Sequence, residues 1–243
     1  MIHLKVQIPA GIVQVGSARP GESPPTKLCV ASFHIDRFAV DNKRFAEFIA
    51  AGGYTNPIWW SAEGWRWVVK INVQTPAFWH DGRFNHDLQP ALVSAHESEA
   101  YAKFVGGSLP TEIQFERAAR GDDERRFPWG DLNPTEEHAN FAPSFCPMAR
   151  APEPVDACPL GDSPFGCRQM AGNVHEWTRD AFQFDTPARR HAGDFVENRP
   201  SARRVLKGGA WTTDETRLWI SARWSYQPGL RDNVVGFRVV YPL

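Results

Sequence analysis

The sequence has no long hydrophobic run and almost no net charge. A membrane-spanning helix needs about 18 or more consecutive apolar residues, and no stretch of the 243 residues meets that requirement. The 27 lysines and arginines nearly balance the 28 aspartates and glutamates, which leaves a formal net charge of -1. Because non-specific nucleic-acid binding depends on an excess of basic residues, we expect neither a membrane nor a nucleic acid as a partner.

Cysteine is scarce, and its spacing does not indicate a metal-binding cluster. The four cysteines are Cys29, Cys146, Cys158 and Cys167, without a CxxC pair. Three of them lie in one short segment, so a disulfide stays open for an exported chain, although free thiols are favoured. The first residues lack a continuous apolar core and a small-residue cleavage site. We therefore expect no secretory signal and a cytoplasmic location.

Tryptophan, proline and glycine are abundant instead, with 10, 20 and 19 copies. This mixture predicts irregular backbone packed around large aromatic rings. We expect one domain over residues 1–243, of the α+β class, with small antiparallel sheets and about three helices. The helices are expected to begin at Asp41 or Asn42, at Ser94 and at Thr111, the last two because of capping-box spacing. The expected strands cover 4–15, 33–40, 204–207, 218–224 and 234–241, and 54–90 is expected to be an ordered, aromatic-rich loop region.

A series of short segments follows the order found in one protein family. The series includes GNVHEW at 172–177 and GGAW at 208–211, and it spans nearly the whole chain. It resembles the sulfatase-modifying-factor family, whose best-known member is the formylglycine-generating enzyme. The resemblance implies a loop-rich fold related to C-type lectins. The segments are 8–16, 33–42, 53–54, 109–121, 128–131, 139–141, 164–166, 170–177, 204–211 and 236–240.

The resemblance also implies where a reactive centre would lie. The copper-dependent members of the family carry two active-site cysteines shortly after the turn that matches 208–211, because thiolates are the soft ligands that Cu(I) prefers. Thr213 and Leu218 occupy those two positions here. We therefore expect no copper and no formylglycine generation, and whether the chain is an enzyme stays open.

A second branch, the ergothioneine-forming sulfoxide synthases, is similar to this chain through 53–54 and 59–67. Its members hold non-haem iron through histidines of an additional helical domain in front of the lectin-like one. Because this chain begins directly with the lectin-like part, we expect that iron site to be absent. The alternative hypothesis is nonetheless an oxygen-using, non-haem-metal oxidoreductase related to this branch. Its least implausible ligands are His80, His86 and a carboxylate from Asp81 or Asp87.

A third branch, the variable proteins of diversity-generating retroelements, resembles the tail at 217–238. Side chains that make contacts at low entropic cost lie between its framework positions. The leading hypothesis is therefore a non-catalytic or diverged domain that binds a protein or another ligand through this C-terminal surface. The candidate ligand-binding residues are Trp219, Arg223, Trp224, Ser225, Tyr226, Gln227, Leu230 and Asn233.

Calcium is the one metal that the resemblance supports. Metal-bearing members hold it around the GNVxEW motif with side-chain and backbone oxygens, which suit a hard cation. The matching positions are Gln169, Gly172, Val174 and Glu176. The alternative is that Glu176 and its neighbour Asn173 only close hydrogen bonds within the loop.

Overall fold

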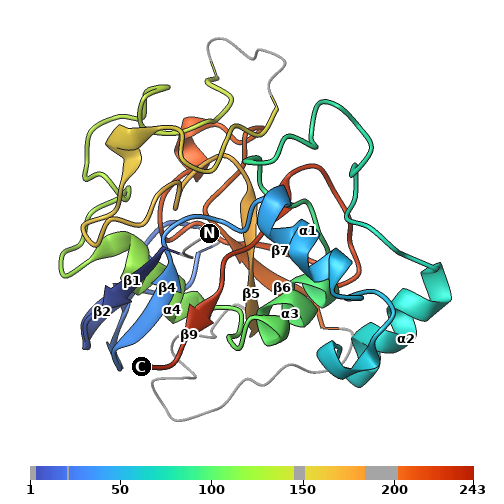
Figure 1. Ribbon diagram of the computed structural model, residues 1–243. Helices are drawn as coiled ribbons and strands as arrows, with labels where there is room; N and C mark the ends of the chain where they lie inside the picture. The colour runs from blue at the N-terminus through green and yellow to red at the C-terminus, as the bar shows by residue number, and fades with distance from the viewer. Residues whose placement is uncertain (1–3, 21, 145–150, 184–201) are drawn as a thin grey trace.

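The computed structural model describes residues 4–20, 22–144, 151–183 and 202–243, and in these ranges short helices and strands are joined by long connections (Figure 1). No helix in the described part of the chain is both long and apolar enough to cross a membrane. The helices are α1 (Asn42–Ala50), α2 (Ala62–Ile71), α3 (Ala95–Phe104) and α4 (Glu112–Arg120), with 3-10 turns η1 (Pro57–Trp59), η2 (Pro159–Gly161) and η3 (Glu215–Arg217). The strands are β1 (Lys5–Ile8), β2 (Gly11–Val15), β3 (Thr26–Val30), β4 (Phe33–Asp36), β5 (His175–Ala181), β6 (Arg204–Lys207), β7 (Trp224–Tyr226), β8 (Val235–Gly236) and β9 (Val240–Tyr241).

Within these ranges the strands form three small sheets. Their orders are β1-β4-β9, β2-β3 and β7-β6-β5-β8, and only the β5-β8 pair is parallel. In the third sheet Leu206 pairs with Trp177 on one side and with Trp224 on the other. Because directly paired residues point to the same face of a sheet, these three side chains share the face that packs on the largest hydrophobic core.

Aromatic rings dominate that core. Phe45 of α1 stacks on Tyr101 of α3 with ring centroids 5.3 Å apart and an interplanar angle of 16°. Phe237 meets Tyr101 edge-on at 5.4 Å, and all three side chains are fully buried. Stacked and edge-to-face pairs stabilise a core beyond the burial of their area. The rings therefore fix α1 and α3 against the C-terminal segment.

The helix starts that were read from capping signals are confirmed. Asp41 accepts a hydrogen bond from the backbone N–H of Arg44 at 2.7 Å at the start of α1. Ser94 and Thr111 each form a complete capping box, with Glu97 and Gln114 returning the hydrogen bond. Each box satisfies backbone donors that the first turn of a helix leaves without partners.

Two expected segments are wrong, and two observed strands, β3 and β5, lie outside every expected strand. The region 54–90 contains a helix, α2, which begins after Ser61 caps the N–H of Gly64 at 3.1 Å. The segment 218–224 is not a strand, because the N–H of Ala222 donates to the carbonyl of Trp219 and closes a turn. Leu218 and Ile220 are buried by that turn. The alternation of apolar and polar residues there reflects a compact turn, and regular pairing begins only with β7.

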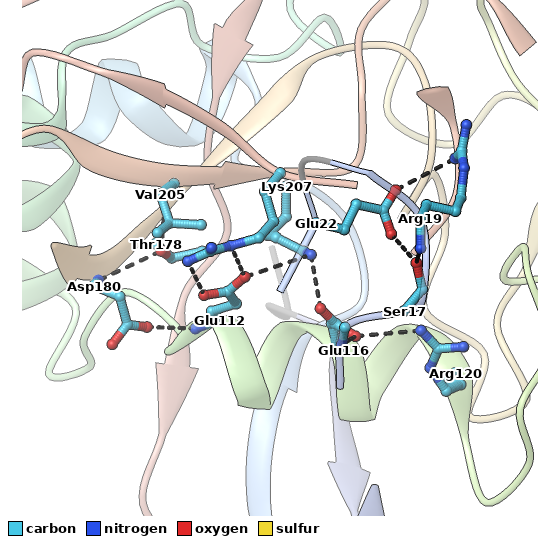
Figure 2. Close-up of polar contacts among 12 residues, drawn as sticks. Ser17, Arg19, Glu22, Glu112, Glu116, Arg120, Thr178, Asp180, Val205 and Lys207 are labelled. Carbon is cyan, nitrogen blue, oxygen red and sulfur yellow. Dashed lines mark hydrogen bonds and ion pairs between the residues drawn. The ribbon is translucent and has the colours of Figure 1, made fainter. Parts of the chain in front are cut away.

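The opposite face of the β7-β6-β5-β8 sheet carries buried charges that pack on α4 (Figure 2). The Nζ of Lys207 lies 2.8 Å from Oε1 of Glu116 and 3.8 Å from Oε1 of Glu112, and none of these side chains is more than 1% exposed. Glu116 also contacts Nη2 of Arg120 at 3.3 Å. Arg223 reaches Oε1 of Glu112 at 2.6 Å through its Nε. We call these five residues the α4 ion network.

Removing the lysine from the α4 ion network is expected to destabilise the protein strongly. In the Lys207→Met variant Glu116 and Glu112 stay buried without that cation, and breaking a buried pair in this way costs about 3–5 kcal/mol. Urea unfolding followed by circular dichroism measures the loss. The control is Arg83→Gln, which removes an exposed ion pair with Asp81 and is expected to leave the midpoint unchanged. Equal midpoints for Lys207→Met and the unaltered protein would contradict the prediction.

Candidate functional site

Two neighbouring pockets open beside η3 and β7. The first, which we call the β7 pocket, has a volume of about 280 Å³. The second, the Trp219 pocket, has a volume of about 440 Å³. Arg19 lines both pockets. The β7 pocket is lined by Arg19, Pro20, Glu22, Arg217, Ala222, Arg223 and Trp224, and the Trp219 pocket by Arg19, Arg126, Phe127, Asn133, Pro134, Phe141, Glu215, Thr216 and Trp219.

The loop after β2 delivers two of these residues. The backbone N–H of Ser17 donates to the carbonyl of Ser23 at 2.9 Å, and the Ser17 hydroxyl donates to the carboxylate of Glu22 (Figure 2). Glu22 then holds Nη1 of Arg19 at 3.3 Å. The Arg19 guanidinium lies 4.2 Å from the centre of the Trp219 ring, a cation–π contact. The loop is thereby fixed against the C-terminal tail.

Arg223 and Arg217 both line the β7 pocket, but only Arg223 is paired with a carboxylate. Arg223 forms a two-point ion pair with Glu112, with Nε–Oε1 at 2.6 Å and Nη2–Oε2 at 3.0 Å, and both side chains are 1% exposed. Arg217 is exposed and its guanidinium lies 5.0 Å from the centre of the Trp224 ring. No carboxylate in the described part of the chain lies within 4 Å of Arg217.

Two buried histidines pack against tryptophan rings, one of which is Trp224 of the β7 pocket. The His175 ring packs on Trp224 with 4.9 Å between centroids, and the His96 ring packs on Trp67 at 5.3 Å. Burial lowers the pKa of His175 to about 3 and that of His96 to about 4. Both imidazoles are therefore neutral at physiological pH.

The structure brings together only part of the set of candidate ligand-binding residues. Arg223 and Trp224 line the β7 pocket, and Trp219 lines the second pocket. The other five line neither of these two pockets; Ser225, for example, accepts a hydrogen bond from Nε of Arg203 at 2.9 Å. The ligand-binding role of the whole set stays a prediction. The five are Ser225, Tyr226, Gln227, Leu230 and Asn233.

The comparisons with known proteins decide the family. The model of the sulfatase-modifying factor enzyme 1-like domain matches residues 2–243. The chain belongs to this family. PvdO from Pseudomonas aeruginosa superimposes with a TM-score of 0.71 at 21% identity, covering 98% of this chain and 94% of that one. The expected loop-rich, C-type-lectin-like α+β fold is thereby confirmed, with four helices described where about three were expected.

Curated relatives include two kinds of enzyme. A hercynine oxygenase of Mycolicibacterium smegmatis is 39% identical over 210 residues, which cover 78% of this chain and 48% of the relative. A formylglycine-generating enzyme of Thermomonospora curvata is 30% identical over 283 aligned positions, which cover 96% of this chain and 91% of the relative. The chain thus spans about half the length of the hercynine oxygenases that it matches.

The two positions that the resemblance implies for copper cysteines lie close together in the structure, and they hold Thr213 and Leu218. A Cβ placed on Gly209 would lie 3.0 Å from Cδ2 of Leu218 and 3.5 Å from Cγ2 of Thr213. Leu218 is fully buried, and the hydroxyl of Thr213 accepts the N–H of Ala210 at 2.9 Å. A methyl group and an engaged hydroxyl are not ligands for Cu(I). The residues present do not fit a copper centre.

The histidine cluster does not form a metal site either. His80 and His86 are exposed, and Asp81 is held by Arg83, with Oδ2–Nη2 at 2.8 Å. Across the described ranges no group of three His, Cys, Asp or Glu side chains is placed to hold a metal ion. The ligand set expected for the alternative hypothesis is therefore not supported, and the described residues do not fit an iron centre.

The positions expected to bind calcium make internal contacts. Both carboxylate oxygens of Glu176 pair with Arg238, at 2.6 Å to Nε and 2.7 Å to Nη2. Oε1 of Gln169 accepts a hydrogen bond from Asn173 at 2.7 Å. Gly172 donates its N–H to Gly208 at 2.7 Å, and the side chain of Val174 lies in an apolar cluster. These contacts include the hydrogen bonds within the loop that were the alternative to calcium binding. Calcium binding at these four positions stays a prediction.

Acidification is expected to destabilise the protein through His175. Its pKa is about 3 in the folded state and about 6.5 when unfolded, so the unfolded chain binds more protons in between. Stability present at neutral pH is therefore lost as the pH falls from about 6.5 toward 3. In His175→Phe, which keeps a ring against Trp224, the pH slope of the unfolding free energy should flatten by up to about 1.4 kcal/mol per pH unit.

Urea unfolding at a series of pH values between about 6.5 and 4 measures that slope. His80→Phe is the control, because His80 is exposed and its replacement is expected to leave the slope unchanged. The same slope in His175→Phe as in the unaltered protein would show that His175 is not held neutral by burial.

Proposed function

We propose that this chain provides the substrate-binding face of an oxygen-using oxidoreductase of the hercynine oxygenase type. The observation that carries the proposal is the 39% identity to a hercynine oxygenase over 78% of the chain, with two further relatives of that name at 35% and 36%. Relatedness at this level supports a shared substrate class more strongly than the fold does, since one fold hosts many functions.

The residues of the two pockets indicate which part of the reaction this chain performs. The β7 pocket and the Trp219 pocket offer arginine and tryptophan side chains that bind and orient a small polar molecule. The described residues offer no donor set for iron or copper. We therefore assign the binding and orientation of the substrate to this chain.

The second candidate is the non-catalytic binding domain that the tail suggests. Treponema denticola variable protein 1 has the same fold, with a TM-score of 0.61 at 18% identity over 98% of this chain and 95% of that one. β7 is an edge strand that carries the half-buried side chains of Trp224 and Tyr226. Edge strands and exposed aromatic side chains are common in protein-binding surfaces, and this favours a macromolecular ligand as the alternative occupant.

Titration with hercynine separates the two candidates. Isothermal titration calorimetry of the purified chain should show saturable binding with a Kd between about 1 μM and 1 mM, the usual range for an enzyme substrate. Trp224→Ala should weaken binding about tenfold or more, because the pocket loses its aromatic wall. Val69→Ala, at an exposed position on α2, is the control. No binding by the folded chain at millimolar hercynine would contradict the proposal and favour the second candidate.

A further inference from the structure

Of the three arginines that line the β7 pocket, one has no carboxylate partner in the described part of the chain. Glu22 pairs with Arg19 at 3.3 Å, and Glu112 pairs with Arg223 at 2.6 Å. Each of these two arginines therefore has a carboxylate partner, and Glu112 also lies 3.8 Å from Nζ of Lys207. Arg217 lacks such a partner within the described part of the chain.

The acids nearest to Arg217 in sequence are engaged elsewhere. Asp214 accepts the N–H of Thr216 at 2.9 Å, and Glu215 accepts the N–H and the hydroxyl of Ser144 at 3.0 and 3.1 Å. Neither carboxylate is within ion-pair distance of Arg217. The charged lining residues Arg19, Glu22, Arg217 and Arg223, taken with Glu112, consequently carry one net positive charge.

The backbone at Arg217 is held by a hydrogen bond and by packing. Arg217 is the last residue of η3, and its N–H donates to the carbonyl of Asp214 at 3.1 Å. The next residue, Leu218, is fully buried and anchors the turn. The guanidinium then lies 5.0 Å from the Trp224 ring centre, and that ring packs on buried His175. A guanidinium stacked on a tryptophan keeps its edge available for two parallel hydrogen bonds.

We propose that the β7 pocket binds one carboxylate group of a small ligand, with Arg217 as the ionic contact and Trp224 as the flat wall beneath it. The fork of a guanidinium matches the two oxygens of a carboxylate. A single unpaired arginine suits a monoanion, and Glu22, a buried residue of the pocket lining, opposes a second negative charge. The volume of about 280 Å³ admits a small molecule. The assignment of this ligand as the substrate rests on the proposed function, whereas the carboxylate site itself does not.

The test uses two ligands, imidazole-4-acetate as a plain carboxylate and hercynine as the proposed substrate. Calorimetric titration of the full chain should show binding of both ligands. Arg217→Gln should weaken binding about tenfold or more, because it removes the charge-assisted, two-point contact to the carboxylate. Arg217→Lys should fall in between, since it keeps the charge and loses the fork. Raising the salt from about 0.05 M to about 0.5 M should weaken binding to the unaltered protein and have little effect on Arg217→Gln.

The controls separate the pocket from the fold and from the function. Arg66→Gln removes an exposed arginine on α2 and is expected to bind like the unaltered protein. Imidazole-4-acetate methyl ester, which lacks the negative charge, should not bind. Equal affinity of Arg217→Gln and the unaltered protein for the carboxylate would overturn the site, as would tighter binding of sulfate than of imidazole-4-acetate. Binding of imidazole-4-acetate without binding of hercynine would support the site and contradict the proposed function.

Discussion

The buried ion network on α4 is the constraint on which the C-terminal half of the fold and the pockets depend. Lys207, with no exposed surface, joins β6 to Glu116 and Glu112 on α4. Glu116 also accepts the N–H of Gly16 at 3.3 Å, which holds the start of the loop that carries Arg19 and Glu22. Glu112 neutralises Arg223 at the entrance to β7. Charges buried this deeply are tolerated only when each has partners in fixed geometry, so the network determines both the position of the strands and the charge of the pocket beside them.

Much of the fold was predictable where local chemistry decides the structure. The Ser94 and Thr111 capping boxes are local devices, because each donor and acceptor lies within one turn, and both were read correctly. The helix α2 was missed because its tryptophans suggested loop aromatics, whereas the local signal was the Ser61 cap. The turn at 218–224 was missed for a different reason. Alternating apolar residues are compatible with a turn that buries Leu218 and Ile220 against distant segments, and periodicity alone cannot separate it from a strand.

The candidate site was predictable only in its tail residues. Trp219, Arg223 and Trp224 were predicted from the resemblance of the tail to the variable proteins, and they do line the two pockets. Arg19 and Glu22 could not be found, because about two hundred positions separate them from the tail and nothing in their own loop indicates the contact with Trp219. Which arginine of the pocket is paired with a carboxylate also depends on the folded chain. Pairing depends on distances that no spacing in the sequence specifies, and it is pairing that distinguishes the arginines of the β7 pocket from one another.

The position of Arg217 links the buried turn around Leu218 to the β7 pocket. The fold still brings Thr213 and Leu218 together beside Gly209, where copper-dependent members of the family carry their cysteines. Leu218, fully buried, now anchors η3 by packing alone. The residue before it is thereby displayed from rigid backbone toward the neighbouring β7 pocket, where its guanidinium lies on Trp224. The packed turn thereby positions the guanidinium of Arg217 for a bound anion, because a functional side chain is placed most precisely when the backbone that carries it is supported by packing.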